Sequence, residues 1–502
     1  MLTGRFERHY TAPMGHHAFF STSLPRIYRY LIRVAAPLGL LLALCGCQPP
    51  TDYAHLEPGG ELVVVTRNSP TTYYIDGDEP TGFDYELARA FAQSQGLTLR
   101  VKLAYSIEEL LNTLEAGEAH IAMGGLAVTD ERAQRFFISE SYFQQKPVVV
   151  YRSGDTRPRS TQDLVGRDVV ALTASSQAAL LQGLKIQLPE LRWRELSGSD
   201  SLLLMQQITD GRAEVAIIDS IELRQQQRLY PRIAAAFILD QQQHAVWLLH
   251  RVPEAQAWLE RVNEFFATQM ATGELNRLTE RHFGSTRYAS RIGSFTFQEK
   301  VGSDLPKWES LIKSVASEYQ LDWRLLAAMA YQESHWDPNA RSITGVRGMM
   351  MLTQSTAQEL GVTDRLDPQQ SLRGGARFLK DLLRRLPQDI EQPDRLWMAL
   401  AAYNIGMGHL EDARIITQRL GGDPHNWEDV RKQLPSLQQP ETYRSTRFGF
   451  ARGEEAVTYV DNIRHYFTTL RLRNLTEQRQ SAPINIADWL PANLSQSLPT
   501  AL

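Results

Sequence analysis

Cysteine is nearly missing from this chain of 502 residues, because Cys45 and Cys47 are the only two that it contains. Both stand close to the N-terminus, so the long remainder can form no disulfide and offers no thiol nucleophile. Its stability must then come from the burial of apolar side chains, and a hydrophobic content of 43% is ordinary for folded globular chains. A chain of this length is sufficient for two or three domains, each with its own core.

Charge of one sign is not in excess either, since 53 Lys and Arg residues against 57 Asp and Glu residues give a net charge of −4. This balance leaves no basic footprint for nucleic acid. The sequence also lacks a glycine-rich phosphate loop and a cluster of His and Cys residues at metal-ligand spacing. We therefore expect no nucleic-acid partner, no metal and no cofactor.

The apolar run near the N-terminus, from Val34 to Leu44, is too short to span a bilayer. Basic residues precede it at Arg26, Arg29 and Arg33, and this order is typical of a secretory signal. The segment that ends at Cys47 resembles a bacterial lipobox, which implies acylation of Cys47. Ordinary signal cleavage nearby, with peripheral attachment, remains the alternative. We expect residues 1–47 to form the signal region and the rest to lie at the periplasmic face of a Gram-negative outer membrane.

One carboxylate, Glu333, stands near the end of a predicted helix from Trp323 to Ser334. Asp322 is a good N-cap for this helix, and Pro338 prevents its continuation. Apolar residues at spacings of three and four place Glu333 on the core-facing stripe, which also carries Leu326, Met329 and Ala330. Burial and the helix C-terminus both disfavour the anion, so we expect a protonated acid near neutral pH. A helix-terminal Glu that only bonds the following loop is the alternative.

Four motifs follow in order around and after this helix: Glu333-Ser334, Gly348-Met349-Met350-Met351, Ala402-Tyr403-Asn404 and Tyr459-Val460. In this order they resemble the motifs of the soluble lytic transglycosylase family, which has a mainly α, lysozyme-like fold. The resemblance extends from about Trp308 to Leu470. Its main departure is Met351, where the family commonly carries Gln, and this puts one hydrogen bond to the glycan in doubt.

The resemblance implies a non-hydrolytic cleavage of peptidoglycan that needs a single carboxylate. Glu333 would protonate the glycosidic oxygen between N-acetylmuramic acid and N-acetylglucosamine and then take a proton from the muramyl 6-hydroxyl. That hydroxyl closes a 1,6-anhydro ring, so the substrate supplies the nucleophile in place of the second carboxylate of ordinary glycosidases.

Supporting roles are implied for the other matched residues. Ser342 would bond an N-acetyl group, Met350 would line the saccharide cleft, and Tyr403 with Asn404 would orient Glu333. Tyr459 would add a wall or a hydroxyl, and Glu455 a second polar group. Two alternatives stay open: Met350 as ordinary core packing, and Glu455 as part of a solvated charge cluster.

The chain before the enzyme-like part alternates short apolar strands with helical patterns, which predicts α/β lobes with parallel-rich sheets. The strand candidates are Leu62 to Val65, Thr98 to Leu103, Ile121 to Gly124, Val169 to Leu172 and Val215 to Asp219. The segments Thr129-Asp130-Glu131-Arg132 and Val215-Ala216-Ile217-Ile218-Asp219, among others, are similar to family-3 extracellular solute-binding proteins. This resemblance extends from about Gly60 to Phe283 and implies a two-lobed periplasmic-binding-protein-like domain.

In that family Arg132 would grip a ligand carboxylate and Asp219 would receive its amino group. The alternative is an Arg that caps a helix and an Asp at a strand end. Ala127 departs from the family, where a hydroxyl residue is common, so ligand affinity would be altered. We expect the ligand to be an amino acid or a peptidoglycan stem peptide.

The expected organisation is a multidomain chain with a binding domain at 58–283, a linker at 284–303, a lysozyme-like domain at 304–475 and a poorly ordered tail at 476–502. Three function classes compete. The leading one is a membrane-associated lytic transglycosylase that acts on peptidoglycan glycan strands and is regulated by its binding domain. The others are an amino-acid or peptide receptor that the second domain anchors to the wall, and a catalytically inert wall-binding scaffold.

Overall fold

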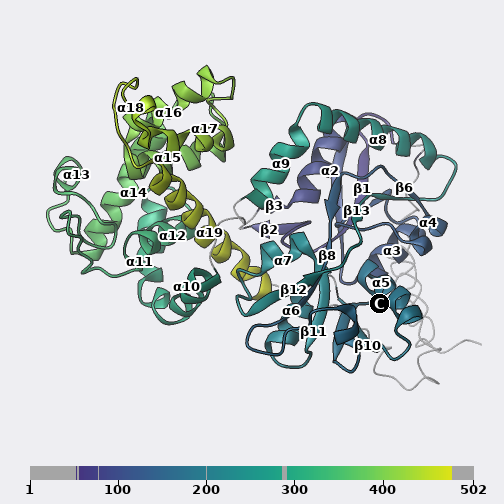
Figure 1. The fold of residues 1–502 in the computed structure, drawn as a ribbon. Helices are drawn as coiled ribbons and strands as arrows, with labels where there is room; N and C mark the ends of the chain where they lie inside the picture. Colours follow the sequence, from purple (N-terminus) through teal and green to yellow (C-terminus); the bar gives the residue numbers. More distant parts are fainter. Residues whose placement is uncertain (1–52, 54–55, 77–78, 199, 285–290, 478–502) are drawn as a thin grey trace, which may run out of the picture. The chain divides into compact units, whose positions relative to one another are not determined.

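The computed structural model describes residues 53, 56–76, 79–198, 200–284 and 291–477. The predicted signal region with Cys47 and the tail beyond residue 477 lie outside the described residues. An α/β arrangement extends to helix α9 (Glu274–Phe283), and a helical arrangement begins at α10 (Arg291–Ser303) (Figure 1). The predicted fold class, an α/β binding-protein-like domain followed by a mainly α domain, is confirmed.

The first sheet of the α/β domain has the strand order β4-β1-β5-β14-β6. Its strands are β1 (Glu61–Arg67), β4 (Thr98–Ala104), β5 (Ile121–Ala122), β6 (Phe136–Ile138) and β14 (Leu248–His250). Strand β1 pairs in parallel with β4 and β5, whereas β14 pairs antiparallel with β5 and β6. Helices beside this sheet in sequence are α2 (Phe83–Ser94), α3 (Ile107–Glu115), α4 (Asp130–Arg135) and α8 (Ala255–Ala271).

The second sheet has the order β10-β9-β11-β8-β12. Its strands are β8 (Pro147–Arg152), β9 (Val169–Leu172), β10 (Trp193–Leu196), β11 (Val215–Asp219) and β12 (Ile233–Ile238), and its helices are α5 (Ser176–Gln187), α6 (Leu202–Thr209) and α7 (Ser220–Gln226). Strands β9, β10 and β11 pair in parallel, and β8 pairs antiparallel with β11 and β12.

Each sheet forms one lobe, and the chain passes between the lobes twice, since β14 returns to the first sheet after β12. Two short ribbons accompany the sheets: β2 (Tyr74–Asp76) with β3 (Glu79–Thr81), and β7 (Phe143–Gln145) with β13 (Gln243–Ala245). After its first residue β1 is buried throughout, as expected where helices cover both faces of a sheet. Its last residue, Arg67, is therefore delivered into the interior.

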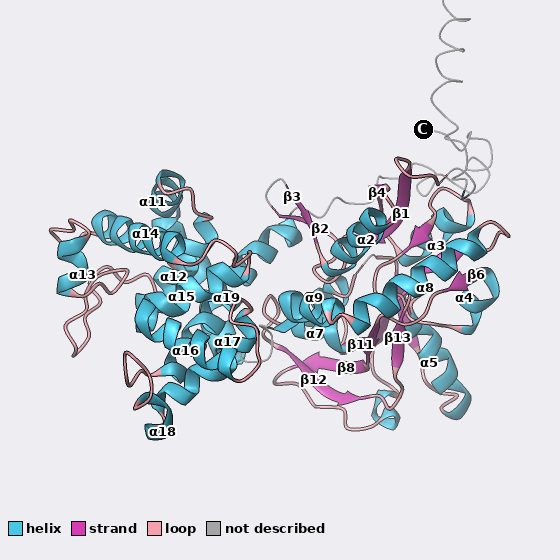
Figure 2. Cartoon of the chain, turned by 90° about the horizontal axis from the view of Figure 1, so that it is seen from above, coloured by secondary structure: helices cyan, strands magenta, loops and turns pink. Residues whose placement is uncertain are grey.

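The described part of the second domain consists of helices, and Figure 2 shows strands only in the α/β domain. After α10 the helices are α11 (Leu305–Glu318), α12 (Trp323–Ser334), α13 (Gln354–Glu359), α14 (Pro368–Arg385), α15 (Asp394–Ile405), α16 (Met407–Arg419), α17 (Trp427–Gln433), the 3-10 helix η4 (Leu434–Gln438), α18 (Pro440–Tyr443) and α19 (Gly453–Glu477).

Helix α12 lies at the centre of this domain and has the predicted bounds and N-cap. The Asp322 side chain accepts a hydrogen bond from the backbone N–H of Arg324. Every residue from Leu325 to Tyr331 is buried, so the helix is enclosed on all sides instead of along one stripe. Its two ends are only partly buried, and Glu333 stands in the last turn.

The segment expected to be a linker is helical over residues 291–303, where it forms α10. Phe297 and Val301, four residues apart on α10, are buried in the core of the helical domain. The Phe297 ring packs against Tyr331 with centroids 4.7 Å apart. Two large apolar side chains suffice to bury one face of a short helix. The four-residue spacing of Phe297 and Val301 does not stand out in the sequence, because the surrounding residues are small and polar.

Candidate functional site

The last turn of α12 carries Glu333, which is partly buried. The hydroxyl of Tyr459, on α19, donates a hydrogen bond of 2.6 Å to Oε1 of Glu333. The Tyr459 ring is parallel to the ring of Tyr403, on α15, with centroids 6.3 Å apart and an interplanar angle of 11°. Three residues that the sequence singled out from three separate helices therefore meet around one carboxyl group.

Burial raises the pKa of Glu333 from 4.5 to about 7, and the hydrogen bond from Tyr459 acts in the opposite direction by favouring the carboxylate. Near neutral pH both the protonated and the ionised form of this carboxyl group are thus populated. A residue with such a pKa can first donate a proton and then accept one.

The two tyrosine hydroxyls around Glu333 have different partners. Burial, followed by the nearby Glu333 charge, raises the pKa of Tyr403 and Tyr459 well above the ordinary tyrosine value, so both stay protonated. Tyr459 donates to Glu333, whereas the buried hydroxyl of Tyr403 has no hydrogen-bond partner among the described residues. Phe378 packs against the Tyr403 ring with centroids 5.0 Å apart. The Tyr403 ring is therefore held in place, and its buried hydroxyl keeps an unused hydrogen-bond donor.

The chain leaves α12 through two residues with left-handed backbone conformations, His335 at φ 55° and Trp336 at φ 63°. The helix thus ends before Pro338 acts. The Trp336 indole is buried and donates a 2.8 Å hydrogen bond to the carbonyl oxygen of Ala327. Ser334 donates a 2.9 Å hydrogen bond to the carbonyl oxygen of Met349. This bond connects the end of α12 to the second motif. Ser334 belongs to the first motif, but the sequence does not show which group it contacts.

Gly348 is required by the backbone of the second motif. Its φ is 82°, and a Cβ atom added there would lie 1.7 Å from the carbonyl oxygen of Arg365. Met351, where the resembled family commonly carries Gln, has a φ of 45° and is partly buried. The loop therefore requires glycine at position 348, whereas at position 351 it accommodates Met with a strained, left-handed backbone.

Ser342 and Met350 occupy different environments. The Ser342 hydroxyl lies in the loop after α12, bonded to the Thr344 hydroxyl at 2.8 Å and accepting from the backbone N–H of Val346 at 3.3 Å. Met350 is fully buried and packs against Gly375 on α14. It is a core residue, which was the alternative left open, and does not line an accessible cleft; the Gly-Met-Met motif could not distinguish the two because both place an apolar side chain there.

Asn404 and Glu455 are both exposed. Asn404 stands next to Tyr403 near the end of α15. Glu455 forms an ion pair with Arg452 at 3.2 Å in the first turn of α19, as in the charge-cluster alternative. Neither forms a hydrogen bond or ion pair with Glu333 among the described residues, so their roles toward substrate remain predictions.

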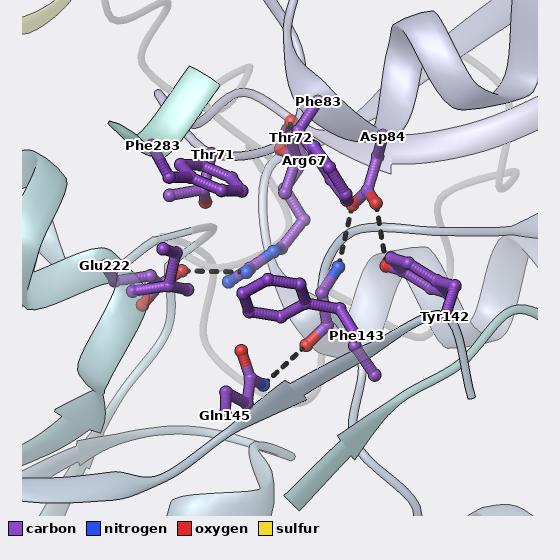
Figure 3. A pocket seen from close by; sticks show the side chains of 13 residues that line it. Arg67, Thr71, Thr72, Phe83, Asp84, Tyr142, Phe143, Gln145, Glu222 and Phe283 are labelled. Atoms are coloured by element: carbon purple, nitrogen blue, oxygen red, sulfur yellow. Dashed lines mark hydrogen bonds and ion pairs between the residues drawn. The ribbon is translucent and has the colours of Figure 1, made fainter. Parts of the chain in front are cut away.

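A small pocket with a water-sized interior of about 20 Å³ lies in the α/β domain where residues of both lobes meet (Figure 3). Across it, Arg67 from β1 forms a buried 2.8 Å ion pair with Glu222 from α7. Asp84 accepts hydrogen bonds from the Tyr142 hydroxyl at 2.7 Å and from the Gly125 backbone N–H at 2.8 Å. Burial nevertheless raises the pKa of Asp84 to about 6. No sequence motif marks this polar set; its one signal in the sequence is a basic residue, Arg67, at the end of a buried strand.

Arg132 and Asp219, the predicted ligand contacts, are both buried. Arg132 donates to the carbonyl oxygens of Ala127 at 2.6 Å and Ala174 at 2.9 Å. Asp219 accepts a 2.7 Å hydrogen bond from Gln177, and burial, followed by the nearby Glu222 charge, raises its pKa to about 8. Neither residue lines the pocket of Figure 3. Both side chains form hydrogen bonds with other residues of the domain, so their part in ligand binding stays a prediction.

Among the residues that the structure describes, no group of three or more His, Cys, Asp and Glu side chains is placed to hold a metal ion. The same residues include no helix that is both long and apolar enough to cross a membrane.

Comparison with known proteins finds two family models on this chain. The model of the transglycosylase SLT domain matches residues 310–425, and that of bacterial extracellular solute-binding proteins, family 3, matches residues 62–285. An ancestral arginine-binding protein solved with arginine is 19% identical, with a TM-score of 0.42, and the match covers 45% of this chain and 100% of that one.

Two relatives that match most of the chain share one name. The membrane-bound lytic murein transglycosylase F of Saccharophagus degradans strain 2-40 is 40% identical over 464 residues, which cover 91% of each chain. The protein of the same name from Ectopseudomonas mendocina strain ymp is 42% identical over 433 residues, which cover 86% of this chain and 88% of that one.

Proposed function

This chain belongs to the membrane-bound lytic murein transglycosylase F family, and on that premise we propose that it cleaves peptidoglycan glycan strands without hydrolysis, with Glu333 as the single acid/base residue. The observation that carries the proposal is the partly buried carboxyl group of Glu333, whose pKa of about 7 suits proton donation followed by proton acceptance. The ordered motifs and the whole-length relatives support the same reaction.

In the proposed reaction the protonated Glu333 donates its proton to the glycosidic oxygen between N-acetylmuramic acid and N-acetylglucosamine. The bond from this oxygen to the muramyl C1 breaks, and the sugar acquires oxocarbenium character. The Glu333 carboxylate then takes the proton of the muramyl 6-hydroxyl while the oxygen of that hydroxyl bonds to C1. No water is consumed, and Glu333 returns to its protonated form with a 1,6-anhydromuramyl end as product.

Tyr459 and Tyr403 divide the supporting work. The Tyr459 hydroxyl holds Oε1 of Glu333 and stabilises the carboxylate that remains after proton donation. The Tyr403 hydroxyl, which has no hydrogen-bond partner among the described residues, is proposed as a donor to the sugar. Ser342 and Asn404 are proposed as further glycan contacts and Glu455 as a peripheral polar group, whereas Met350 supports the loop from the core.

Digestion of murein sacculi by the protein and by its Glu333→Gln variant tests this proposal. Mass spectrometry should find anhydromuramyl products that are absent with the variant. Reducing-end products would mean hydrolysis and an unrecognised second carboxylate. If neither protein released products, the receptor or scaffold function would be favoured.

We further propose that the α/β domain binds an amino acid or a stem peptide and that closure of its lobes alters access to Glu333. Buried Arg132 provides a positive charge for the ligand carboxylate, and the Asp219 carboxyl group, which burial keeps protonated near neutral pH, would lose its proton as the ligand's ammonium group binds. Arg132 already bonds carbonyl oxygens that follow β5 in one lobe and β9 in the other. Calorimetric titration of the full chain with free amino acids and stem peptides should show binding that Arg132→Ala abolishes and Arg194→Ala, at an exposed ion pair, leaves intact. An absence of any heat of binding would contradict this part.

Membrane association is proposed to occur through acylated Cys47 at the outer membrane. Metabolic labelling with radioactive palmitate should mark the wild-type chain and not a Cys47→Ala variant. Label retained in that variant would refute lipidation at this residue, and an unlabelled wild-type chain that still fractionates with membranes would indicate peripheral attachment.

A further inference from the structure

The segment between α18 and α19 carries two exposed aromatic rings. Hydrogen bonds to a buried carboxylate hold its backbone in place. Phe448 is 50% exposed and Phe450 is 55% exposed. The carboxylate of Asp412, which is buried on α16, accepts hydrogen bonds from the backbone N–H groups of Arg447 at 3.1 Å and Phe448 at 2.9 Å. Single exposed Phe side chains are common on protein surfaces and need no functional explanation. Here, however, the buried Asp412 carboxylate holds the backbone of the loop that carries both rings.

Each ring is also supported by a neighbour. Phe448 packs on the first turn of α16, so closely that a Cβ atom added to Gly408 would lie 2.6 Å from the ring. His409 meets the Phe448 ring edge-on, with centroids 6.2 Å apart. Tyr443 meets Phe450 at an interplanar angle of 88°, with centroids 5.8 Å apart. Both rings are propped in position while about half of each remains open to solvent.

The rings adjoin the two helix ends that lead to the site around Glu333. Gly408, which contacts Phe448, is the second residue of α16, the helix that directly follows the Tyr403 motif. Phe450 precedes the first residue of α19 by three positions, which span at most about 10 Å. Tyr459 lies six residues into α19, or about 9 Å along its axis. The rings and the catalytic carboxyl group are thus separated by a distance that a few linked sugar rings can bridge.

We propose that Phe448 and Phe450 form a stacking platform for the peptidoglycan glycan strand outside the bond-cleaving position. The apolar faces of N-acetylhexosamine rings match exposed aromatic rings, and the basic side chains of Arg444 and Arg447 in the same segment are exposed. Arg447 lies over Phe448 at 5.4 Å. These cations suit the carboxylates that muramyl peptides carry. The platform rests on the proposed function, since it holds the strand that Glu333 cleaves.

The test compares long glycan strands with short oligosaccharides as substrates of the full chain. In a Phe448→Ala/Phe450→Ala variant, KM for long strands should rise roughly tenfold, the equivalent of about 1.4 kcal/mol. The kcat value and the cleavage of oligosaccharides too short to reach the rings should not change. Leu420→Ala, which removes another exposed apolar side chain (68% exposed) from the same domain, should leave all values unchanged. Equal effects of the two variants would overturn the platform.

Sedimentation with sacculi separates this proposal from the proposed reaction. In a Glu333→Gln background, which cannot cleave, the double alanine variant should lose roughly tenfold in sacculus affinity, and Trp at both positions should restore it. Gly408→Ala should weaken binding in the same direction by displacing Phe448. If wild-type protein released no anhydromuramyl products but the affinity loss persisted, the reaction would fail and the platform would stand.

The competing occupant is a membrane surface, because aromatic and basic side chains together also suit a lipid headgroup region. A Phe448→Leu/Phe450→Leu variant keeps apolar bulk but loses the flat rings. We expect it to bind sacculi as weakly as the alanine variant. The proposal would be refuted if the leucine variant bound sacculi fully and also bound vesicles of phosphatidylethanolamine and phosphatidylglycerol, while the alanine variant lost vesicle binding. That result would assign the rings to the membrane.

Discussion

Replacing Glu333 by Gln should stabilise the helical domain at neutral and alkaline pH while it abolishes cleavage. The pKa of Glu333 is raised from 4.5 to about 7 because its carboxylate is desolvated. The folded state therefore holds this proton more tightly than the unfolded state does. The corresponding stability is fully present below pH 4.5 and is lost as the pH rises through about 7.

This pKa difference corresponds to about 3 kcal/mol, since one pH unit is equivalent to about 1.4 kcal/mol. Gln has the same shape, carries no charge at any pH and still accepts the hydrogen bond from Tyr459. The free energy of unfolding of the variant should therefore match wild type near pH 4 and exceed it by about 3 kcal/mol at pH 8.

The assay is calorimetric unfolding of the full chain from pH 4 to pH 8, following the transition of the helical domain. Glu455→Gln is the control, because Glu455 is exposed and its ion pair with Arg452 contributes little. Its difference from wild type should stay near zero at every pH. Parallel pH curves for wild type and Glu333→Gln would refute the desolvation of Glu333 and with it the acid/base assignment.

Three further changes have defined outcomes. Tyr459→Phe removes the donor to Glu333, so the pKa of Glu333 should rise further and the alkaline limb of the kcat profile should move to higher pH, while kcat at pH 5 falls by roughly tenfold or more. Gly348→Ala should destabilise the helical domain by at least about 3 kcal/mol in calorimetry, since its left-handed backbone and a blocking carbonyl oxygen exclude a Cβ atom. Glu222→Gln should cost about 2–3 kcal/mol in the unfolding of the α/β domain, because Arg67 loses a buried charged partner but keeps an amide acceptor.

Matched variants make these outcomes specific. Tyr466→Phe lies on the same helix as Tyr459 and should leave the pH profile unmoved. Gly345→Ala has a similar φ of 87° but meets no atom within 4 Å, so it should cost only about 1 kcal/mol. Glu454→Gln removes an exposed carboxylate and should leave stability nearly unchanged. A shift with Tyr466→Phe, or equal costs for the two glycines, would contradict the geometric arguments.

Much of the fold followed from local patterns. Five strands of the α/β domain, β1, β4, β5, β9 and β11, were predicted because they are apolar runs bounded by turns, whereas other strands such as β8 and β12 were not predicted. Helix α12 was found with its N-cap because Asp322 and the helix-forming residues after it act locally. Helix α10 was missed, since only its packing against Tyr331 distinguishes Phe297 from an isolated apolar residue in a polar segment.

The candidate site divides in the same way. The order of the motifs named Glu333, Tyr403 and Tyr459, and the structure brings these three together. The same motifs named Met350, which is a core residue, because an apolar side chain in a motif carries no information on whether it faces a cleft or the interior. Ser334 lay within a motif, but its partner, the Met349 carbonyl oxygen, could not be read from the sequence.

The sequence by itself determined the two domain types and the family and singled out Glu333 as the candidate acid, since these inferences depend on residue type, order and local periodicity. Tertiary structure alone decided the pKa of Glu333, the hydrogen bond that Tyr459 donates to it and the ion pair of Arg67 with Glu222 across the lobes. The physical reason is that desolvation and hydrogen-bond partners depend on atoms brought together from distant parts of the chain.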